Sequence, residues 1–225
     1  MAHITSLQIG LPQDRPALSD RQPAYRTGFW KSPVTGPQLL DAHGLVGDGQ
    51  ADLVNHGGTD KALCLYAAAH YPAWQQELGL ADFPPGAFGE NLTVAGGDGV
   101  AGDEPMTEET VCLGDLWQVG TARVQVSQPR QPCWKLGRRW EMTDLPGKVI
   151  RSGRTGWYVR VISPGMIAAG DTIQRLARPH PDWPLSRLNH LMYRAKQDEA
   201  LLREALTLPA LSTSWREHFM SRLEP

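Results

Sequence analysis

Glycine and proline recur along most of this 225-residue chain, with 23 glycines and 18 prolines. Both residues interrupt regular secondary structure, because glycine frees the backbone and proline restricts it. Such frequent interruption favours many short elements joined by tight turns over a bundle of long helices. Hydrophobic residues make up 41% of the chain and charged residues 20%, as in ordinary globular proteins.

Short strands dominate the expected structure up to about residue 177. Strands are predicted in residues 4–9, at the end of NHGGTDKALCLY (55–66), in FGENLTV (88–94), in a hairpin at 111–130 that turns at Gly120-Thr121, and in 156–163 and 164–176. Tyr71, Trp74 and Leu78 have helical spacing within residues 67–80, and a second short helix is expected in residues 133–141. Residues 11–37 are expected to be a long irregular segment.

The pattern changes after RPHPDWP (178–184), where leucines and aromatic residues recur at helical spacing in three groups. Ser214 and Glu217 fit a capping box at the start of the last group. We therefore predict a mostly β (α+β) domain over residues 1–177 and a small helical extension over 178–225.

Composition argues against several protein classes. The net charge is −2 and no long basic run is present, so we expect no binding to nucleic acid or anionic membranes. No apolar run approaches the roughly 20 residues of a transmembrane helix, and the first residues do not resemble a signal peptide. Three cysteines without a C-x-x-C pair argue against a zinc knuckle and favour free thiols in a cytoplasmic protein.

Cys133 lies in SQPRQPCWKL (127–136), between two prolines and a tryptophan. Pro129 and Pro132 stiffen this segment, and the cations Arg130 and Lys135 would favour the nucleophilic, metal-binding thiolate. The alternative is that Cys133 is a small hydrophobic residue after a turn. The other two cysteines lie in apolar runs, where core packing is the expected role.

Three further stretches combine turn residues with polar side chains: WKS (30–32), HGGTDKA (56–62) and FGEN (88–91). Successive turn amides can cradle an anion, and His56 stands beside such a Gly-Gly turn. Arg130 could bind a phosphate or carboxylate with two hydrogen bonds. The alternatives are a structural hydrogen bond for His56, a turn cap for Asn91 and a solvated Arg130.

Three functional hypotheses stay open at this point. Cys133 could be a nucleophile with His56 as base, in a hydrolase or transferase. It could instead be a soft ligand in a metal or cofactor site. The third hypothesis is a non-catalytic sulfur carrier or ligand-binding module.

The order of the motifs resembles the MOSC family, the molybdenum cofactor sulfurase C-terminal domain family. The resemblance rests on the ordered stretches GLVGDGQAD, NHGGTDKALCLYAAAHYPAW, FGENLTV, CLGDLWQVGTARVQVSQPRQPCWKL and PGMIAAGDTI. It covers most of residues 3–177. The helical tail at 180–225 resembles the three-helix extension of the YiiM-type members.

This resemblance implies a β-barrel-like fold with peripheral helices, and a molybdenum cofactor in which a pterin dithiolene holds the metal. Cys133 stands at the position of the protein ligand to molybdenum. The residues expected to face the pterin or its phosphate are Lys31, Ser32 and Arg130, with His56, Asn91, Ser127 and Gln128 as further candidates. Lys61 and Lys135 would belong to an electropositive rim.

The implied activity is reduction of N-hydroxylated compounds, such as hydroxylaminopurine-like bases, by oxygen-atom transfer. The chain has no Rossmann fingerprint and no iron–sulfur pattern, so a separate flavin or haem protein would supply electrons. The alternative within the family is a non-catalytic cofactor or sulfur carrier. The chain shows no pyridoxal-phosphate domain to deliver sulfur, which favours the reductase.

Overall fold

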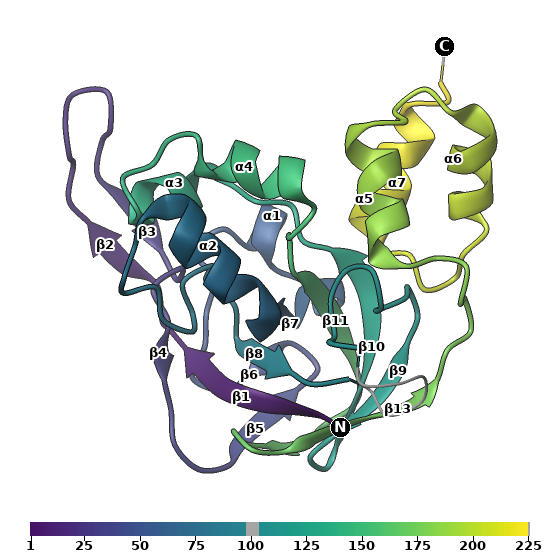
Figure 1. The fold of residues 1–225 in the computed structure, drawn as a ribbon, viewed down its shortest axis with the longest axis horizontal. Helices are drawn as coiled ribbons and strands as arrows, with labels where there is room; N and C mark the ends of the chain where they lie inside the picture. The colour runs from purple at the N-terminus through teal and green to yellow at the C-terminus, as the bar shows by residue number, and fades with distance from the viewer. Residues whose placement is uncertain (98–103, 225) are drawn as a thin grey trace.

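A seven-stranded barrel forms the centre of the molecule in the computed structural model, which describes residues 1–97 and 104–224. The strand order is β13-β9-β10-β11-β7-β8-β1, and β1 pairs back onto β13 (Figure 1). β7 and β8 are parallel, whereas the other neighbours in the barrel are antiparallel. The strands are β1 (Ala2–Ile9), β7 (Leu63–Ala67), β8 (Leu92–Ala95), β9 (Leu116–Val119), β10 (Ala122–Pro129), β11 (Trp157–Ser163) and β13 (Thr172–Ala177). The predicted barrel-like fold is confirmed.

The strand β10 explains how the barrel leads into the Cys133 segment. Its residues Ala122, Val124 and Val126 alternate toward the apolar interior, as expected of a strand with one solvated face. The register with β11 shifts between Val126 and Gln128. Beyond this irregularity the alternation ends, and residues 127–130 are all buried. A bulge of this kind changes the direction of a strand and of its side chains.

Small strands surround the barrel. The segment 11–37, expected to be irregular, contains two strands that pair with each other and one that pairs with β1, so that expectation is wrong. These strands are β2 (Gln13–Arg15), β3 (Tyr25–Thr27) and β4 (Ser32–Pro33). A further sheet, which the sequence analysis did not anticipate, has the order β12-β5-β6 and contains β5 (Gln38–Asp41), β6 (Gly44–Leu45) and β12 (Gly165–Ile167).

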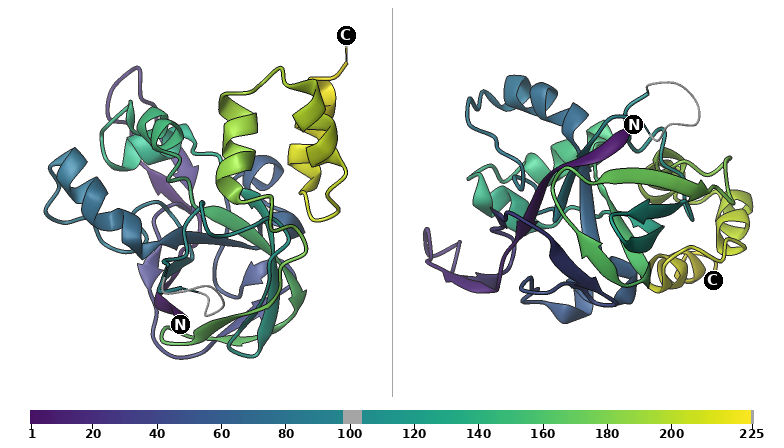
Figure 2. Two further views of the ribbon diagram at one scale, coloured as in Figure 1. Left: turned by 45° about the vertical axis from the view of Figure 1, so that its right-hand side comes forward. Right: turned by 90° about the horizontal axis from the view of Figure 1, so that it is seen from below.

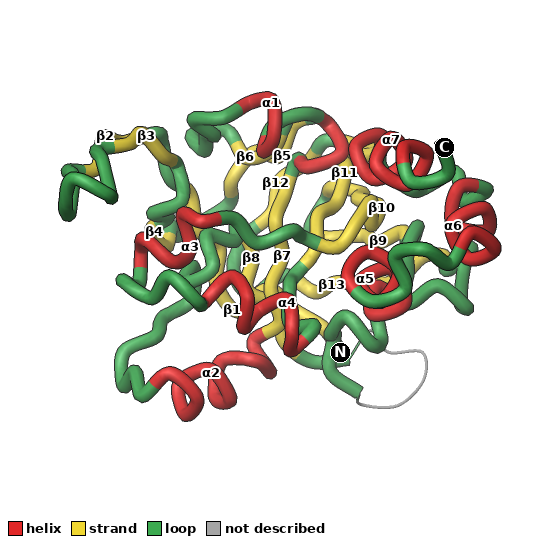
Figure 3. The backbone as a smooth tube through the Cα atoms, turned by 90° about the horizontal axis from the view of Figure 1, so that it is seen from above, coloured by secondary structure: helices red, strands yellow, loops and turns green. Residues whose placement is uncertain are grey.

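The helices form two groups at one end of the barrel (Figure 2). One group contains α2 (Tyr71–Leu78), α3 (Trp134–Arg139) and α4 (Leu145–Ser152), and the other contains α5 (Leu185–Tyr193), α6 (Glu199–Leu206) and α7 (Thr213–Ser221). The short helix α1 (Leu53–His56) lies near β5 and β6, at the edge opposite α2, when the molecule is seen from above (Figure 3). Short 3-10 turns occupy Thr59–Lys61 and Ala68–His70. The predicted helices α2, α3 and α5–α7 are present, whereas α1 and α4 were not anticipated.

The ends of two helices test the local predictions. Gly79 ends α2 with a positive φ of 65°, as glycine after a helix often does. The capping box predicted for α7 is wrong, because Ser212 rather than Ser214 caps that helix. The Ser212 hydroxyl accepts a hydrogen bond from the Trp215 amide at 3.4 Å. The helix therefore begins about two residues earlier than expected, and Ser214 is free to contact another segment.

Two hydrophobic clusters hold these layers together. The larger one includes Trp117 and Trp157 of the barrel together with Trp215 and Phe219 of α7, so the barrel and the extension share one continuous core. The smaller one packs α2, α3 and α4 around Phe88. The division after residue 177 stays a prediction. No helix in the described ranges is long and apolar enough to cross a membrane.

Candidate functional site

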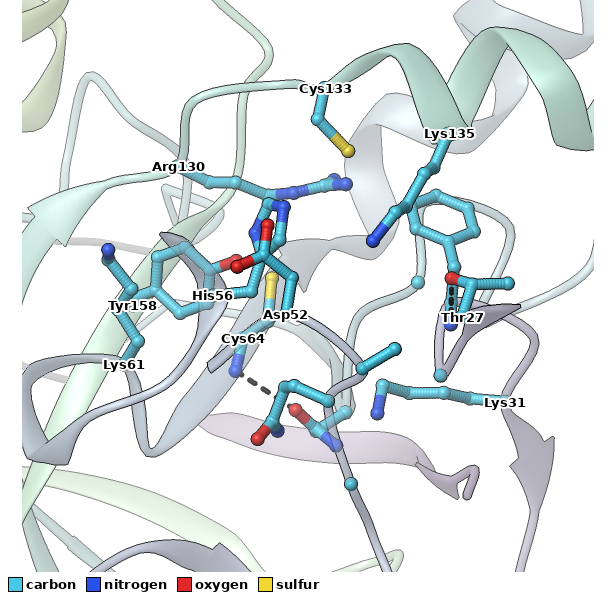
Figure 4. Close-up of a pocket in the computed structure, with 17 residues that line it drawn as sticks. Thr27, Lys31, Asp52, His56, Lys61, Cys64, Arg130, Cys133, Lys135 and Tyr158 are labelled. Atoms are coloured by element: carbon cyan, nitrogen blue, oxygen red, sulfur yellow. Dashed lines mark hydrogen bonds between the residues drawn. The ribbon is translucent and has the colours of Figure 1, made fainter. Parts of the chain in front are cut away.

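A pocket opens at the helical end of the barrel and contains about 580 Å³ of space that is continuous with solvent. Sites for small molecules and cofactors are concave pockets in which a few polar side chains converge. Figure 4 shows its charged and sulfur-containing side chains converging from several elements. The lining residues are Thr27, Gly28, Phe29, Lys31, Gly49, Gln50, Ala51, Asp52, His56, Lys61, Cys64, Gly89, Asn91, Arg130, Cys133, Lys135 and Tyr158.

Cys133 is the N-cap residue of α3, with the extended backbone angles that the proline-flanked segment predicts. Its thiol is half-buried and is directed into the pocket, into which Arg130 and Lys135 also point (Figure 4). Cys64 lines the floor of the same pocket from β7. Burial raises the pKa of the Cys64 thiol to about 11, so this sulfur stays protonated near neutral pH.

Arg130 is a buried cation with an incomplete set of partners. Only 4% of the residue is exposed, and its guanidinium carbon lies 5.6 Å from the centre of the Phe29 ring. Its Nη1 atom is buried and has no hydrogen-bond partner. In the described part of the chain, no carboxylate lies within ion-pair distance of it. Burial of an unpaired charge costs free energy, so this group is prepared for an anion that the chain does not supply.

Lys31 and Asn91 line the pocket but already have protein partners. Lys31 forms an ion pair with Asp48, and both side chains are almost fully buried. The Asn91 Nδ2 donates to Asp48 Oδ2 at 2.9 Å, and the Asn91 Oδ1 accepts from the Cys64 amide at 3.2 Å. Asn91 thus connects β7 to the loop before α1 instead of capping its own turn.

His56 and two lysines form the remaining polar wall. Burial, with the positive charges of Lys135 and Arg130, lowers the pKa of His56 to about 4, so the imidazole is neutral near pH 7. Lys61 donates to the Asn55 carbonyl at 2.8 Å, and burial lowers its pKa. Lys135 makes no ion pair with any residue in the described ranges 1–97 and 104–224. The wall is therefore electropositive, with Asp52 as its acidic neighbour.

The hypothesis of a Cys133 nucleophile with His56 as base finds little support in this geometry. No hydrogen bond joins the two side chains within the described residues. A base whose conjugate acid has a pKa of about 4 also removes protons poorly at neutral pH.

Three predicted binding residues do not line the pocket. Ser32 is exposed in β4. The buried Ser127 hydroxyl donates to the carbonyls of Asp60 at 2.6 Å and Tyr158 at 3.0 Å. Gln128 accepts a hydrogen bond from Ser214 at 3.3 Å. Ser127 and Gln128 thus form hydrogen bonds to segments behind the pocket wall and do not face the pocket.

The sequence analysis missed several lining residues, notably Thr27, Phe29, Gly49, Asp52 and Tyr158. Four of them lie in the long stretch 11–37 or in the turn-dense HGLVGDGQAD (43–52), and that density of turn residues was the available signal. Tyr158 has no such signal, because its ring belongs to an ordinary β-rich segment. Burial raises the pKa of its hydroxyl, which therefore stays protonated.

The residues present fit an anionic cofactor that brings a soft metal. The unpartnered Arg130 Nη1 and the free cation of Lys135 suit phosphate, and the Cys133 thiol suits a thiolate-binding metal. Among the residues described, no group of three or more His, Cys, Asp or Glu side chains could hold a metal ion. A metal at Cys133 would take its other ligands from the cofactor itself, as a pterin dithiolene allows.

Comparisons with known proteins identify the family of the chain. The model of the MOSC domain matches residues 52–174, and that of the YiiM-like, 3-alpha helix domain matches residues 183–224. The uncharacterized protein YflK of Bacillus subtilis is 40% identical over 219 residues, 97% of this chain and 93% of that protein. A Gibberella moniliformis protein named "Reductase" is 35% identical over 191 residues, which are 81% of this chain but 31% of that longer protein.

A solved structure shows the same architecture over the full length. The crystal structure of YiiM from Geobacillus stearothermophilus is 33% identical and superposes with a TM-score of 0.80, with 100% of both chains covered.

Proposed function

The chain belongs to the MOSC domain family, and from that premise we propose that it is a molybdenum-cofactor-dependent reductase of N-hydroxylated compounds. The MOSC domain is associated with molybdenum-cofactor binding in general. The observation that supports the proposal best is the buried Arg130, whose Nη1 has no hydrogen-bond partner, in the same pocket as the half-buried Cys133 thiol. A relative named "Reductase" supports a redox role.

The proposal assigns a role to each of the main side chains of the pocket. The Cys133 thiolate would bind the metal, and its place at the start of α3 fixes its direction. Arg130 and Lys135 would bind the anionic end of the cofactor. Phe29 supports the Arg130 guanidinium, and the neutral His56 can offer a hydrogen bond without adding charge. Lys31 would act mainly through its ion pair with Asp48, which holds the floor of the pocket.

When bound, the cofactor supplies two-electron oxygen-atom transfer, a reaction that no side chain of the pocket can perform alone. The overall reaction takes a hydroxylamine, two electrons and two protons to the amine and water. The electrons would come from a separate flavin or haem protein in the cytoplasm. The chain's own residues orient the cofactor, surround it with fixed positive charge and limit its access to water.

The test is turnover with a chemical reductant. Protein from a host that makes the cofactor is incubated with a hydroxylaminopurine and dithionite-reduced viologen, and formation of the aminopurine is followed by chromatography. The wild type and a Cys112→Ser control, altered at a buried cysteine outside the pocket, should both produce the amine. Cys133→Ser should not. Protein that contains molybdenum but forms no amine would be the non-catalytic cofactor or sulfur carrier instead.

A further inference from the structure

The C-terminal helices contact the end of β10 directly before the Arg130–Cys133 segment (Figure 3). At the start of α7, the Ser212 amide donates to the Ser127 carbonyl at 3.1 Å. The Ser214 hydroxyl, free because it does not cap the helix, donates to Gln128 Oε1 at 3.3 Å. Both acceptors lie within three residues of Arg130.

Helix α5 contacts the same segment from a second direction. The side-chain Nε2 of Gln131 donates to the Met192 sulfur at 3.8 Å. The buried Asn189 donates to the Thr155 hydroxyl at 3.0 Å. The next residue, Gly156, accepts a hydrogen bond from the Arg130 amide at 2.9 Å. Asn189 thus supports the backbone on which Arg130 rests.

The start of α7 also reaches the wall that contains Lys61. The Thr213 amide donates to Asp60 Oδ2 at 2.9 Å, and Arg160 pairs with the other oxygen of Asp60 at 2.8 Å. The Asp60 carbonyl accepts from the Ser127 hydroxyl. The extension therefore binds both segments that border this side of the pocket, the one before Lys61 and the one before Arg130.

We propose that the three-helix extension positions the cofactor-binding segment, with Asn189 and Ser214 as positioning residues. The role rests on the proposed function, since the segment it holds contains the proposed metal ligand. The physical reason lies in Arg130, whose burial without a carboxylate favours movement of its segment toward water. The hydrogen bonds from α5 and α7 oppose that movement and hold Arg130 and Cys133 facing the pocket. Outer contacts of this kind commonly affect metal affinity by about tenfold to a hundredfold.

The experiment compares two double variants of the full-length protein. Asn189→Leu/Ser214→Ala removes the side-chain hydrogen bonds that Asn189 and Ser214 donate to the segments behind the pocket. Thr207→Val/Ser221→Ala is the matched control, because it removes two exposed hydroxyls that bond only to carbonyls of their own helices. Molybdenum and pterin contents are measured in protein from a cofactor-competent host. Iodoacetamide labelling at each cysteine is followed by mass spectrometry in cofactor-free protein, beside thermal unfolding.

The test variant should be labelled by iodoacetamide at Cys133 about fivefold faster or more, the factor expected from loss of a net hydrogen bond in a local opening. Its cofactor content should fall about tenfold, while labelling of the buried Cys64 and Cys112 and the midpoint of unfolding stay near those of the control. An unchanged labelling rate at Cys133 would overturn the proposal. So would equal acceleration at all three cysteines, which indicates general destabilisation. The labelling result decides the positioning role even if the wild type binds no molybdenum, an outcome that would refute the proposed function alone.

Discussion

The guanidinium of Arg130 lies 5.6 Å above the centre of the Phe29 ring, and one of its buried nitrogens has no hydrogen-bond partner. A cation over an aromatic ring is only partly compensated for the water it has lost. Within the described residues no carboxylate completes the compensation. We interpret the pair as the base of an anion site whose ligand comes from outside the chain.

Replacement of Arg130 by methionine should lower cofactor binding without lowering the stability of the fold. The cofactor-free variant should unfold with a free energy that is unchanged or raised by up to about 3 kcal/mol, because an apolar residue replaces an unpaired buried charge. Its molybdenum and pterin contents should fall by at least about tenfold, the value of one charge-assisted hydrogen bond. Urea unfolding and elemental analysis measure the two effects. Arg123→Met, on the exposed face of β10, should alter neither, and a strong loss of stability in Arg130→Met would contradict the interpretation.

Acid should destabilise the protein partly through His56. The unfolded chain binds a proton at this residue near its ordinary pKa of 6.5, whereas the folded state does so only near 4. Falling pH between these values therefore favours the unfolded state. The loss should be about 1–2 kcal/mol after allowance for solvent screening. His56→Gln should lose less stability than the wild type between pH 7 and pH 4 in urea titrations, and parallel pH profiles would show that His56 is protonated equally in both states.

Gly89 should be intolerant of a side chain for two reasons that a matched variant can separate. Its φ is 74°, and an added Cβ would lie 2.8 Å from the Phe29 ring. Gly79 has a similar φ of 65° but nothing within 4 Å of the added carbon. Gly79→Ala should cost about 1 kcal/mol through the backbone alone, and Gly89→Ala a further 1–3 kcal/mol, roughly the cost of overpacking. Equal losses in urea unfolding would mean that Phe29 moves freely and does not fix Arg130.

The Lys31–Asp48 pair should matter for folding far more than an exposed pair does. The exposed fractions of the two side chains are 6% and 3%, so Asp48→Asn leaves a buried, unpaired ammonium group. We expect a loss of about 3 kcal/mol in the free energy of unfolding. Asp14→Asn breaks the exposed pair with Arg26, whose side chains are 58% and 81% exposed, and should cost under about 1 kcal/mol. Losses of similar size in the two variants would contradict this assignment of Lys31.

The backbone conformation at Cys133 was predictable because its determinants are neighbours in the sequence. The two prolines before it predict an extended segment, and Cys133 does begin a helix from extended backbone. The role of Lys31 was not predictable, because its partner Asp48 follows 17 residues later and meets it only through the fold. Ser127 and Gln128 contact Asp60 and Ser214, which are separated from them by 67 and 86 residues. Periodicity and turn residues therefore predict many elements and some pocket-lining positions, whereas the partners that neutralise or redirect a side chain depend on long-range contacts.

The most direct test of the central claim is the metal and pterin content of purified protein. Wild-type protein and Cys133→Ala are expressed with ample molybdate in a host that makes the cofactor, and molybdenum is measured by elemental analysis beside pterin fluorescence. We predict near-stoichiometric molybdenum and pterin in the wild type and loss of metal in the variant. Absence of both from the wild type, or equal metal in the two proteins, would contradict a cofactor site at Cys133.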